Sequence, residues 1–92
     1  MSWQVEYTSK AVRQLKKLPV SIKDTILALV MDIENTGPIR GDWPNFSKLG
    51  LINYHCHLKK GKPTYVACWR VLDKKNKIIE VYYVGTHEKA PY

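Results

Sequence analysis

Beyond a short N-terminal segment, the hydrophobic period of the chain changes from a helical period in the first half to a period of two in the second half. On residues 19–35 the apolar side chains fall on one helical face, at Ile22, Ile26, Leu29, Val30 and Ile33. After residue 50 apolar and polar residues alternate, which is typical of half-buried strands. Because helices and strands occupy separate parts of the chain, the sequence predicts an α+β fold.

Residues before the main helix predict a short strand followed by a first helix. Residues 3–7 alternate between apolar and polar side chains, so they favour a strand. Residues 8–18 have helical spacing of apolar side chains, and Thr8 or Ser9 is a suitable N-cap. Pro19 ends this helix and can begin the second, because proline is tolerated in the first helical turn.

The second half predicts a loop and three strands. The loop "IRGDWPNFSKLG" is followed by "LINYHCHL", "PTYVACWRVL" and "KIIEVYYV", which are rich in β-branched and aromatic residues. The segments "KKGK" and "DKKN" suit hairpin turns between them. We therefore expect one domain, residues 1–92, in which an N-terminal strand and a two-helix hairpin pack on one face of a mainly antiparallel sheet of about four strands.

Strict alternation also predicts which side chains of these strands face the helices. The expected core set is Tyr54, Cys56, Leu58, Tyr65, Ala67, Trp69, Val71, Ile79, Val81 and Tyr83. The opposite face is then expected to carry Asn53, His55, His57, Lys59, Val66, Cys68, Arg70, Leu72, Glu80 and Tyr82. A shift of one residue in register would exchange the two sets, so the assignment depends on regular pairing.

The charge balance indicates a polyanionic partner. Fifteen lysines and arginines stand against eight acidic residues, which gives a net charge of +7. Residues 45–92 contribute nine basic and three acidic side chains, or +6, so we expect an anion site in that half. Nucleic acid, a membrane surface or an acidic protein would fit, and a merely solvated lysine surface is the alternative.

Other features of the sequence favour a cytoplasmic protein without a membrane segment. The N-terminus lacks the apolar region of a signal peptide, and no run of apolar residues is long enough to cross a membrane. The two cysteines, Cys56 and Cys68, do not form a CxxC pair and fit a reducing compartment.

The pair His55 and His57 lies on one side of its predicted strand, a spacing that some metal sites use. A structural zinc ion needs two further ligands, and neither His87 nor Cys68 lies at a recognisable spacing. Neighbouring lysines would also oppose a divalent cation. We therefore expect no metal and no cofactor.

The same residues match the needs of RNA cleavage by the 2′-hydroxyl. That reaction needs a base, an acid and positive charge beside the phosphorane, and histidine can be base or acid near neutral pH. His55, His57 and His87 could share these roles, with Arg70 as a cation. Glu80 is a second candidate base, although a cross-strand ion pair with Arg70 explains it more simply.

Five lysines are candidate contacts for RNA phosphates: Lys48, Lys59, Lys60, Lys62 and Lys89. Lysines at hairpin tips are often just solvated, and this explains Lys74, Lys75 and Lys77 well enough. Tyr92 could stack on a base, although the composition of the tail "GTHEKAPY" favours fraying.

The order of these segments resembles the RelE/ParE superfamily of toxins from type II toxin–antitoxin systems. The resemblance is carried by "AVRQLKKLP", "SKLG", three strands and the tail "GTHEKAPY", and it covers nearly the whole chain. It implies a small, basic, cytoplasmic bacterial protein with a RelE-like fold and a cognate antitoxin. In this family the RelE-like branch cleaves mRNA on the ribosome without metal, and the ParE-like branch inhibits DNA gyrase.

The resemblance also implies roles for particular residues. Family members carry catalytic cations in a Y-K-x-K-L-R strand, which matches residues 54–59 here, with His55 and His57 at the two lysine positions. A G-x-[RH] element corresponds to residues 85–87, and a functional tyrosine to Tyr92. An arginine that binds the scissile phosphate usually begins the third strand, and Val66 stands there instead.

Taken together, the sequence predicts a metal-independent endoribonuclease, an mRNA interferase that inhibits translation. The expected catalytic residues are His55, His57, Arg70, His87 and Tyr92, and the expected partners are an antitoxin, mRNA and the ribosome. A gyrase inhibitor or a catalytically inactive binding relative is the alternative, because the arginine expected at Val66 is missing. A nucleic-acid binder without chemistry is a third reading.

Overall fold

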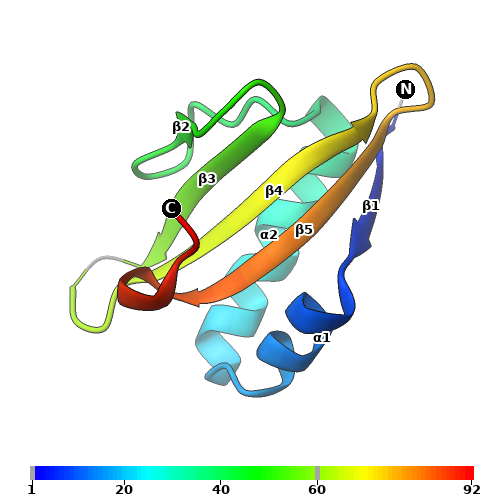
Figure 1. Cartoon of the computed structure of the whole chain (residues 1–92). Coiled ribbons are helices and arrows are strands. Elements are labelled where there is room, and N and C mark those ends of the chain that lie inside the picture. Colours follow the sequence, from blue (N-terminus) through cyan, green and yellow to red (C-terminus); the bar gives the residue numbers. More distant parts are fainter. Residues whose placement is uncertain (1, 60) are drawn as a thin grey trace.

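The structure, a computed structural model, describes residues 2–59 and 61–92 and contains two helices against one face of a twisted sheet (Figure 1). In chain order the elements are β1 (Gln4–Tyr7), α1 (Ser9–Lys16), α2 (Val20–Thr36), β2 (Ser47–Lys48), β3 (Asn53–Lys59), β4 (Tyr65–Asp73), β5 (Ile78–Thr86) and the 3₁₀ helix η1 (His87–Lys89). The strand order is β1-β5-β4-β3-β2; β1 and β5 pair in parallel, and the other neighbouring strands are antiparallel.

This architecture confirms the predicted α+β class and the helical hairpin on one face of a mainly antiparallel sheet. The predicted number of strands was too low by one. Ser47 and Lys48, which fall in the expected loop, form a two-residue edge strand that pairs with His55 and Tyr54. So short a strand has no alternation long enough to reveal it in the sequence.

The helix ends follow local capping chemistry. The Thr8 side chain accepts a hydrogen bond of 3.0 Å from the backbone N–H of Ala11, which makes it the N-cap of α1. Pro19 precedes the first residue of α2, and Gly37 follows its last. Gly37 has a φ of 98°, a conformation that glycine adopts without a steric penalty. The predicted helix boundaries are correct within two residues.

The main core lies between the helices and the sheet. It contains the five apolar residues of α2 that the sequence predicted, together with Ala11, Tyr54, Cys56, Leu58, Ala67, Trp69, Ile79 and Val81. Trp69 is fully buried at its centre, and its indole N–H donates a 3.1 Å hydrogen bond to the carbonyl of Pro38. The rings of Phe46 and Tyr54 pack against it, with centroids 6.1 and 6.3 Å away.

A β-bulge in β5 overturns one part of the predicted core. Cys68 pairs with Tyr83, but the next residue, Trp69, pairs with Val81, so Tyr82 is an extra residue in β5. Tyr83 was expected to face the helices. It lies instead on the opposite face, and Val84 takes the helix side.

The opposite face of the sheet is not an open surface. Val66, Cys68 and Tyr83 form a second buried cluster there, and Leu49 and Ala90 pack against it. The C-terminal tail crosses this face, whereas both helices lie behind the sheet (Figure 1). The predicted side of Val66 and Cys68 is therefore correct, but they are covered rather than exposed to solvent.

A second irregularity moves Lys59 out of its expected row. The β3–β4 register slips after His57, so Lys59 pairs with Tyr65, which packs on the helix side. Because directly opposed residues share a face of a sheet, Lys59 does not continue the row of His55 and His57. The prediction for Lys59 was wrong because it assumed unbroken alternation.

Both cysteines are free and buried, Cys56 in the core beside the helices and Cys68 in the cluster on the opposite face. Burial raises the pKa of each thiol to about 12, so both remain protonated at neutral pH. Within the described residues no helix has the length and apolar character needed to cross a membrane.

Candidate active site

Three histidines and a tyrosine meet on the sheet face that the helices leave free. The ring centroids of His55 and His57 are 5.8 Å apart, and those of His57 and His87 are 5.4 Å apart. Tyr92 lies 4.5 Å from His55 and 5.9 Å from His87. We call these four residues the histidine cluster. It joins β3 to the C-terminal segment, which are more than 25 residues apart in the chain.

The backbone holds both sides of the histidine cluster in place. The N–H of His87 donates to the carbonyl of Thr64 at 2.8 Å, which extends the β4–β5 ladder by one residue. The Tyr83 hydroxyl donates to the carbonyl of Thr86 at 2.7 Å and fixes the chain just before His87. On the other side the N–H of His57 donates to the carbonyl of Pro44 at 2.8 Å.

His55 is the buried member of the cluster, with 7% of its surface exposed. The Ser47 hydroxyl lies 2.9 Å from its Nδ1, so the edge strand β2 orients the imidazole. Burial lowers the pKa of His55, and hydrogen bonding to the backbone of Ser47 opposes this only in part. His55 is therefore neutral at pH 7 and suited to positioning its neighbours.

His57 and His87 are the accessible members. Burial lowers the pKa of His57, and positive charge on His87 lowers it further. Both effects favour the neutral form of His57 at pH 7. Burial also raises the pKa of the Tyr92 hydroxyl to about 12, so Tyr92 is a neutral hydrogen-bond donor at physiological pH.

The lowered histidine pKa values predict that the protein loses stability in mild acid. The unfolded chain binds more protons than the folded one below about pH 6.5, the ordinary histidine pKa, so unfolding becomes easier as the pH falls. The free energy of unfolding, measured with urea at pH 7.5 and 5.5, should be smaller at pH 5.5. The variant His55→Gln should reduce this difference, and an equal difference in wild type and variant would contradict the assignment to His55.

Arg70 lies apart from the histidine cluster. It pairs with Glu80 across β4 and β5, and its Nε and Nη2 donate to one carboxylate oxygen at 2.9 and 2.7 Å. Its guanidinium carbon also lies 4.6 Å from the ring centroid of Tyr82, whose hydroxyl accepts from Asn53. The ion-pair interpretation of Glu80 is confirmed, and much of the charge of Arg70 is already engaged.

The candidate lysines fall into two groups. Lys48 is opposite Tyr54 in the sheet and lines a hollow on the helix side with Ile39 and Leu51, away from the histidine cluster. Lys59, Lys62 and Lys89 are exposed at the end of the molecule where β3 ends and η1 begins. Lys60 lies outside the described residues.

Sequence reasoning missed Ser47, the hydrogen-bond partner of His55. Its role depends on the pairing of β2 with β3, and two residues give no periodic signal. The packing of Tyr92 was also mispredicted, because composition favoured fraying and the structure places its ring against His55. Among the described residues, no three His, Cys, Asp or Glu side chains form a group that could hold a metal ion.

Comparisons with known proteins find similarity in three dimensions only. No protein-family model and no curated protein sequence matches the chain. A mutant of Escherichia coli toxin RelE in the free state matches with a TM-score of 0.73 and 16% identity, over 96% of this chain and 86% of that one. Archaeal RelE in complex with RelB, from Pyrococcus horikoshii, gives 0.73 and 18%, over 98% and 100% of the two chains. The intact E. coli RelBE complex gives 0.71 and 15%, over 96% and 100%.

These likenesses define the class of fold: a helical hairpin on a five-stranded mixed sheet. More particularly, the chain has the fold of the RelE toxins over nearly its full length, as the sequence resemblance predicted.

Proposed function

We propose that this protein is a RelE-like toxin of a bacterial toxin–antitoxin system, in which residues 1–92 act as a single cytoplasmic domain. Its activity is metal-independent endonucleolytic cleavage of mRNA on the ribosome and, because histidines can supply both acid and base, also of free RNA, and this inhibits translation. The observation that carries the proposal is the histidine cluster, in which three imidazoles and a tyrosine lie together on one face of the sheet. The RelE fold supports it independently.

The proposed reaction is transesterification within the RNA. The 2′-oxygen of one nucleotide attacks the adjacent phosphorus while a base removes the hydroxyl proton. The bond from phosphorus to the 5′-oxygen breaks, and an acid protonates that oxygen. The products are a 2′,3′-cyclic phosphate and a free 5′-hydroxyl, so neither water nor an oxidant is consumed.

The geometry suggests a division of roles within the cluster. His57 is neutral at pH 7 and accessible, which suits the base that takes the 2′-hydroxyl proton. His87 is exposed and adjacent to it, which suits the acid for the 5′-oxygen. His55 positions its neighbours, and Tyr92 offers a ring for stacking and a hydroxyl for hydrogen bonding.

Positive charge for the phosphorane would come from Lys62 and Lys89, whereas Lys59, on the helix side at the same end of the molecule, would contact a phosphate farther along the RNA. Arg70 is opposite Asn53 in the sheet, next to the pair of His55 with Cys68. Each lysine is exposed, so its side chain is free to follow a phosphate. Arg70 would contribute only if the substrate competes with Glu80 for its guanidinium.

The proposed protein partner is a cognate antitoxin. RelE is found in complex with RelB in the archaeal structure and in the intact E. coli structure that this fold matches. An antitoxin for this chain should be acidic, because the net charge here is +7 and complementary charge speeds and orients association.

The test is induced expression in bacteria with sequencing of mRNA 5′ ends. We expect growth arrest and new ends that carry a 5′-hydroxyl, and His87→Ala should reduce both. Growth without new ends, or equal cutting by wild type and His87→Ala, would contradict the proposed function.

A second candidate is a protein-binding toxin that inhibits gyrase, or an inactive relative retained for binding. Two observations favour it: the residue opposite His57 is the buried Val66 instead of an arginine, and Arg70 is paired with Glu80. Gyrase inhibition would leave mRNA intact and trap cleaved DNA, so the same cells separate the two candidates.

A further inference from the structure

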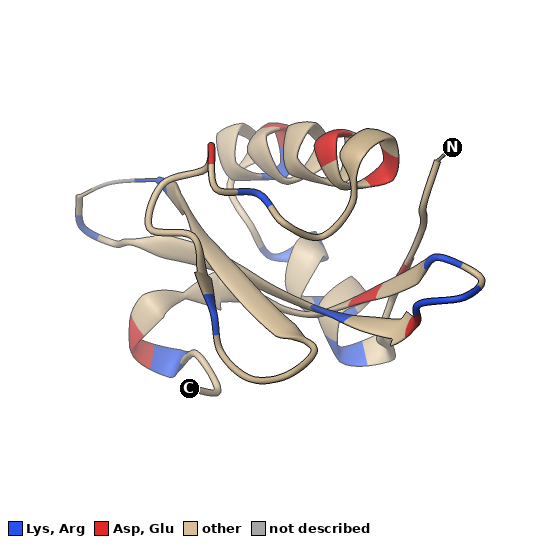
Figure 2. Ribbon diagram, turned by 90° about the horizontal axis from the view of Figure 1, so that it is seen from above, with Lys and Arg blue, Asp and Glu red and all other residues tan. Residues whose placement is uncertain are grey.

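Helix α1 presents a basic surface that is not evident from the net charge of the first half of the sequence. The first 44 residues are almost neutral, yet the fold places their charges apart: acidic side chains lie on α2, whereas α1 carries basic ones (Figure 2). Lys10, Arg13, Lys16 and Lys17 belong to α1 or its C-cap, and α1 contains no acidic residue. Among the described residues, none of these four forms an ion pair.

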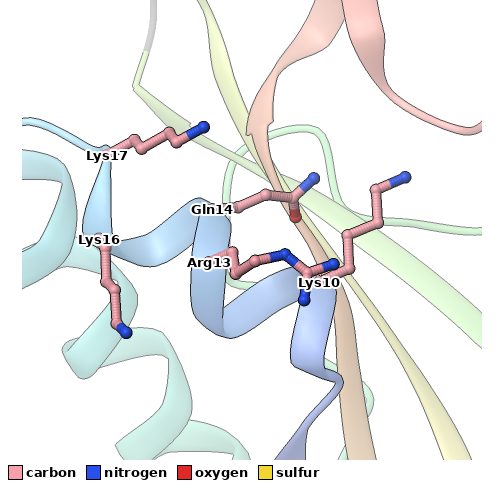
Figure 3. Close-up of a pocket in the computed structure, with 5 residues that line it drawn as sticks. All are labelled: Lys10, Arg13, Gln14, Lys16 and Lys17. Carbon is pink, nitrogen blue, oxygen red and sulfur yellow. The ribbon is translucent and has the colours of Figure 1, made fainter.

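Two adjoining hollows turn part of this surface into a groove. A hollow of about 420 Å³ lies along α1, and one of about 550 Å³ continues from it to the end of β5 and η1. Both are lined by Lys10, Gln14 and Lys17, which extend on the same side of the helix (Figure 3). Arg13 and Lys16 line only the first hollow. Lys89 and Glu88 line the far end, and Glu88 is the one acidic side chain among the described residues that line the two hollows.

The groove follows the open edge of β5 around the sheet. β1 pairs with β5 only as far as Val81, so the rest of β5 has no strand on that side. The Gln14 side chain accepts a 3.1 Å hydrogen bond from the N–H of Val84 there. This caps the edge against an added strand, so a peptide bound by β-augmentation does not fit well.

We propose that this α1 groove binds the phosphate backbone of single-stranded RNA and guides it to the histidine cluster. The inference rests on the proposed function, because it assigns a second binding surface to the same substrate. Lys10 and Lys17 contact phosphates at one end and Lys89 at the other. Lys89 is two residues from His87 in the same 3₁₀ turn, so the far end of the groove lies in the turn that carries the proposed acid.

The lining favours RNA over an acidic protein. Tyr65 lies in the groove wall with part of its ring exposed, which offers a surface for base stacking. Gly85 has no side chain, so it leaves the groove open at this point. A Cβ at this position would lie only 2.8 Å from the Tyr83 hydroxyl. A row of lysines with an aromatic ring and an open floor is the pattern of a channel that tracks a single strand.

The test measures binding of a fluorescent dodecanucleotide whose 2′-positions are O-methylated, so that it cannot be cut. The pair Lys10→Gln/Lys17→Gln is compared with Lys74→Gln/Lys75→Gln at the opposite hairpin, which removes the same charge. The groove pair should weaken binding about tenfold and lower the slope of log Kd against log salt by about 1.4, since each single-strand phosphate contact contributes about 0.7. The control pair should change Kd less than twofold.

A length series with cleavable RNA completes the experiment. The groove pair should raise KM for a dodecanucleotide while kcat and the cleavage of a trinucleotide stay unchanged, since only the longer RNA reaches the groove. If wild type cuts RNA and both lysine pairs bind it equally, the groove inference fails alone. If wild type neither binds nor cuts RNA, the proposed function fails with it.

Discussion

Replacement of His57 by alanine should slow RNA cleavage by about 10²–10⁴-fold, the usual contribution of a general base. The side chain is neutral at pH 7 because burial and the neighbouring His87 lower its pKa, so it can accept the 2′-hydroxyl proton. The measurement is single-turnover cleavage of a short RNA by purified protein. For the wild type, the rate should rise with pH through a pKa below 6.5, because the base must lose its proton first.

The matched control is Asn53→Ala, on the same strand and the same face. Asn53 donates a hydrogen bond to Tyr82 and is paired with Arg70 across β3 and β4, outside the histidine cluster. We expect its cleavage rate to stay within about threefold of wild type, since surface changes of this kind cost little stability. Equal rates for His57→Ala and Asn53→Ala would remove His57 from the base role.

Replacement of Trp69 by alanine should destabilise the fold by about 3–5 kcal/mol, the usual cost of truncating a buried tryptophan. Trp69 is fully buried, contacts the aromatic rings of Phe46 and Tyr54, and ties β4 to the end of α2 through Pro38. For a domain of this size, such a loss lowers the melting temperature by more than about 12 °C. Thermal denaturation followed by circular dichroism measures it.

The companion variant Trp69→Phe separates packing from hydrogen bonding. It keeps an aromatic ring but leaves the Pro38 carbonyl without its donor, so we expect a smaller loss, about 1–3 kcal/mol. If Trp69→Ala melts within a few degrees of wild type, the aromatic centre of the core contributes less than its burial implies.

Most of the fold follows from periodicity, since local patterns determine where elements begin and which faces are apolar. The α2 face, the Thr8 cap and the core sides of β3 and β4 could all be predicted from the sequence. The side of Tyr83 and the row of Lys59 could not, because each depends on a bulge set by pairing with another strand. Alternation within one strand carries no information about such a slip.

The candidate site divides in the same way. The pair His55 and His57 was visible as an alternation, and the ion pair of Arg70 with Glu80 followed from symmetric hairpin pairing. His87 was a candidate from its chemistry, but only the family resemblance implied where His87 and Tyr92 lie, because the path of an irregular tail depends on tertiary packing. The basic face of α1 was overlooked because net charge was summed along the chain instead of over the folded surface.

The bulge at Tyr82 has a consequence for how the site tolerates insertions and deletions. With the extra residue, Tyr83 and Gly85 share the face of His57, and by the same parity His87 does too. Without it, every residue after Val81 would exchange sides, and His87 would leave β5 toward the helices. The face of the sheet on which His87 lies thus depends on whether the number of residues between Val81 and His87 is odd or even. A one-residue deletion in this part of β5 would therefore disassemble the site without removing any of its side chains.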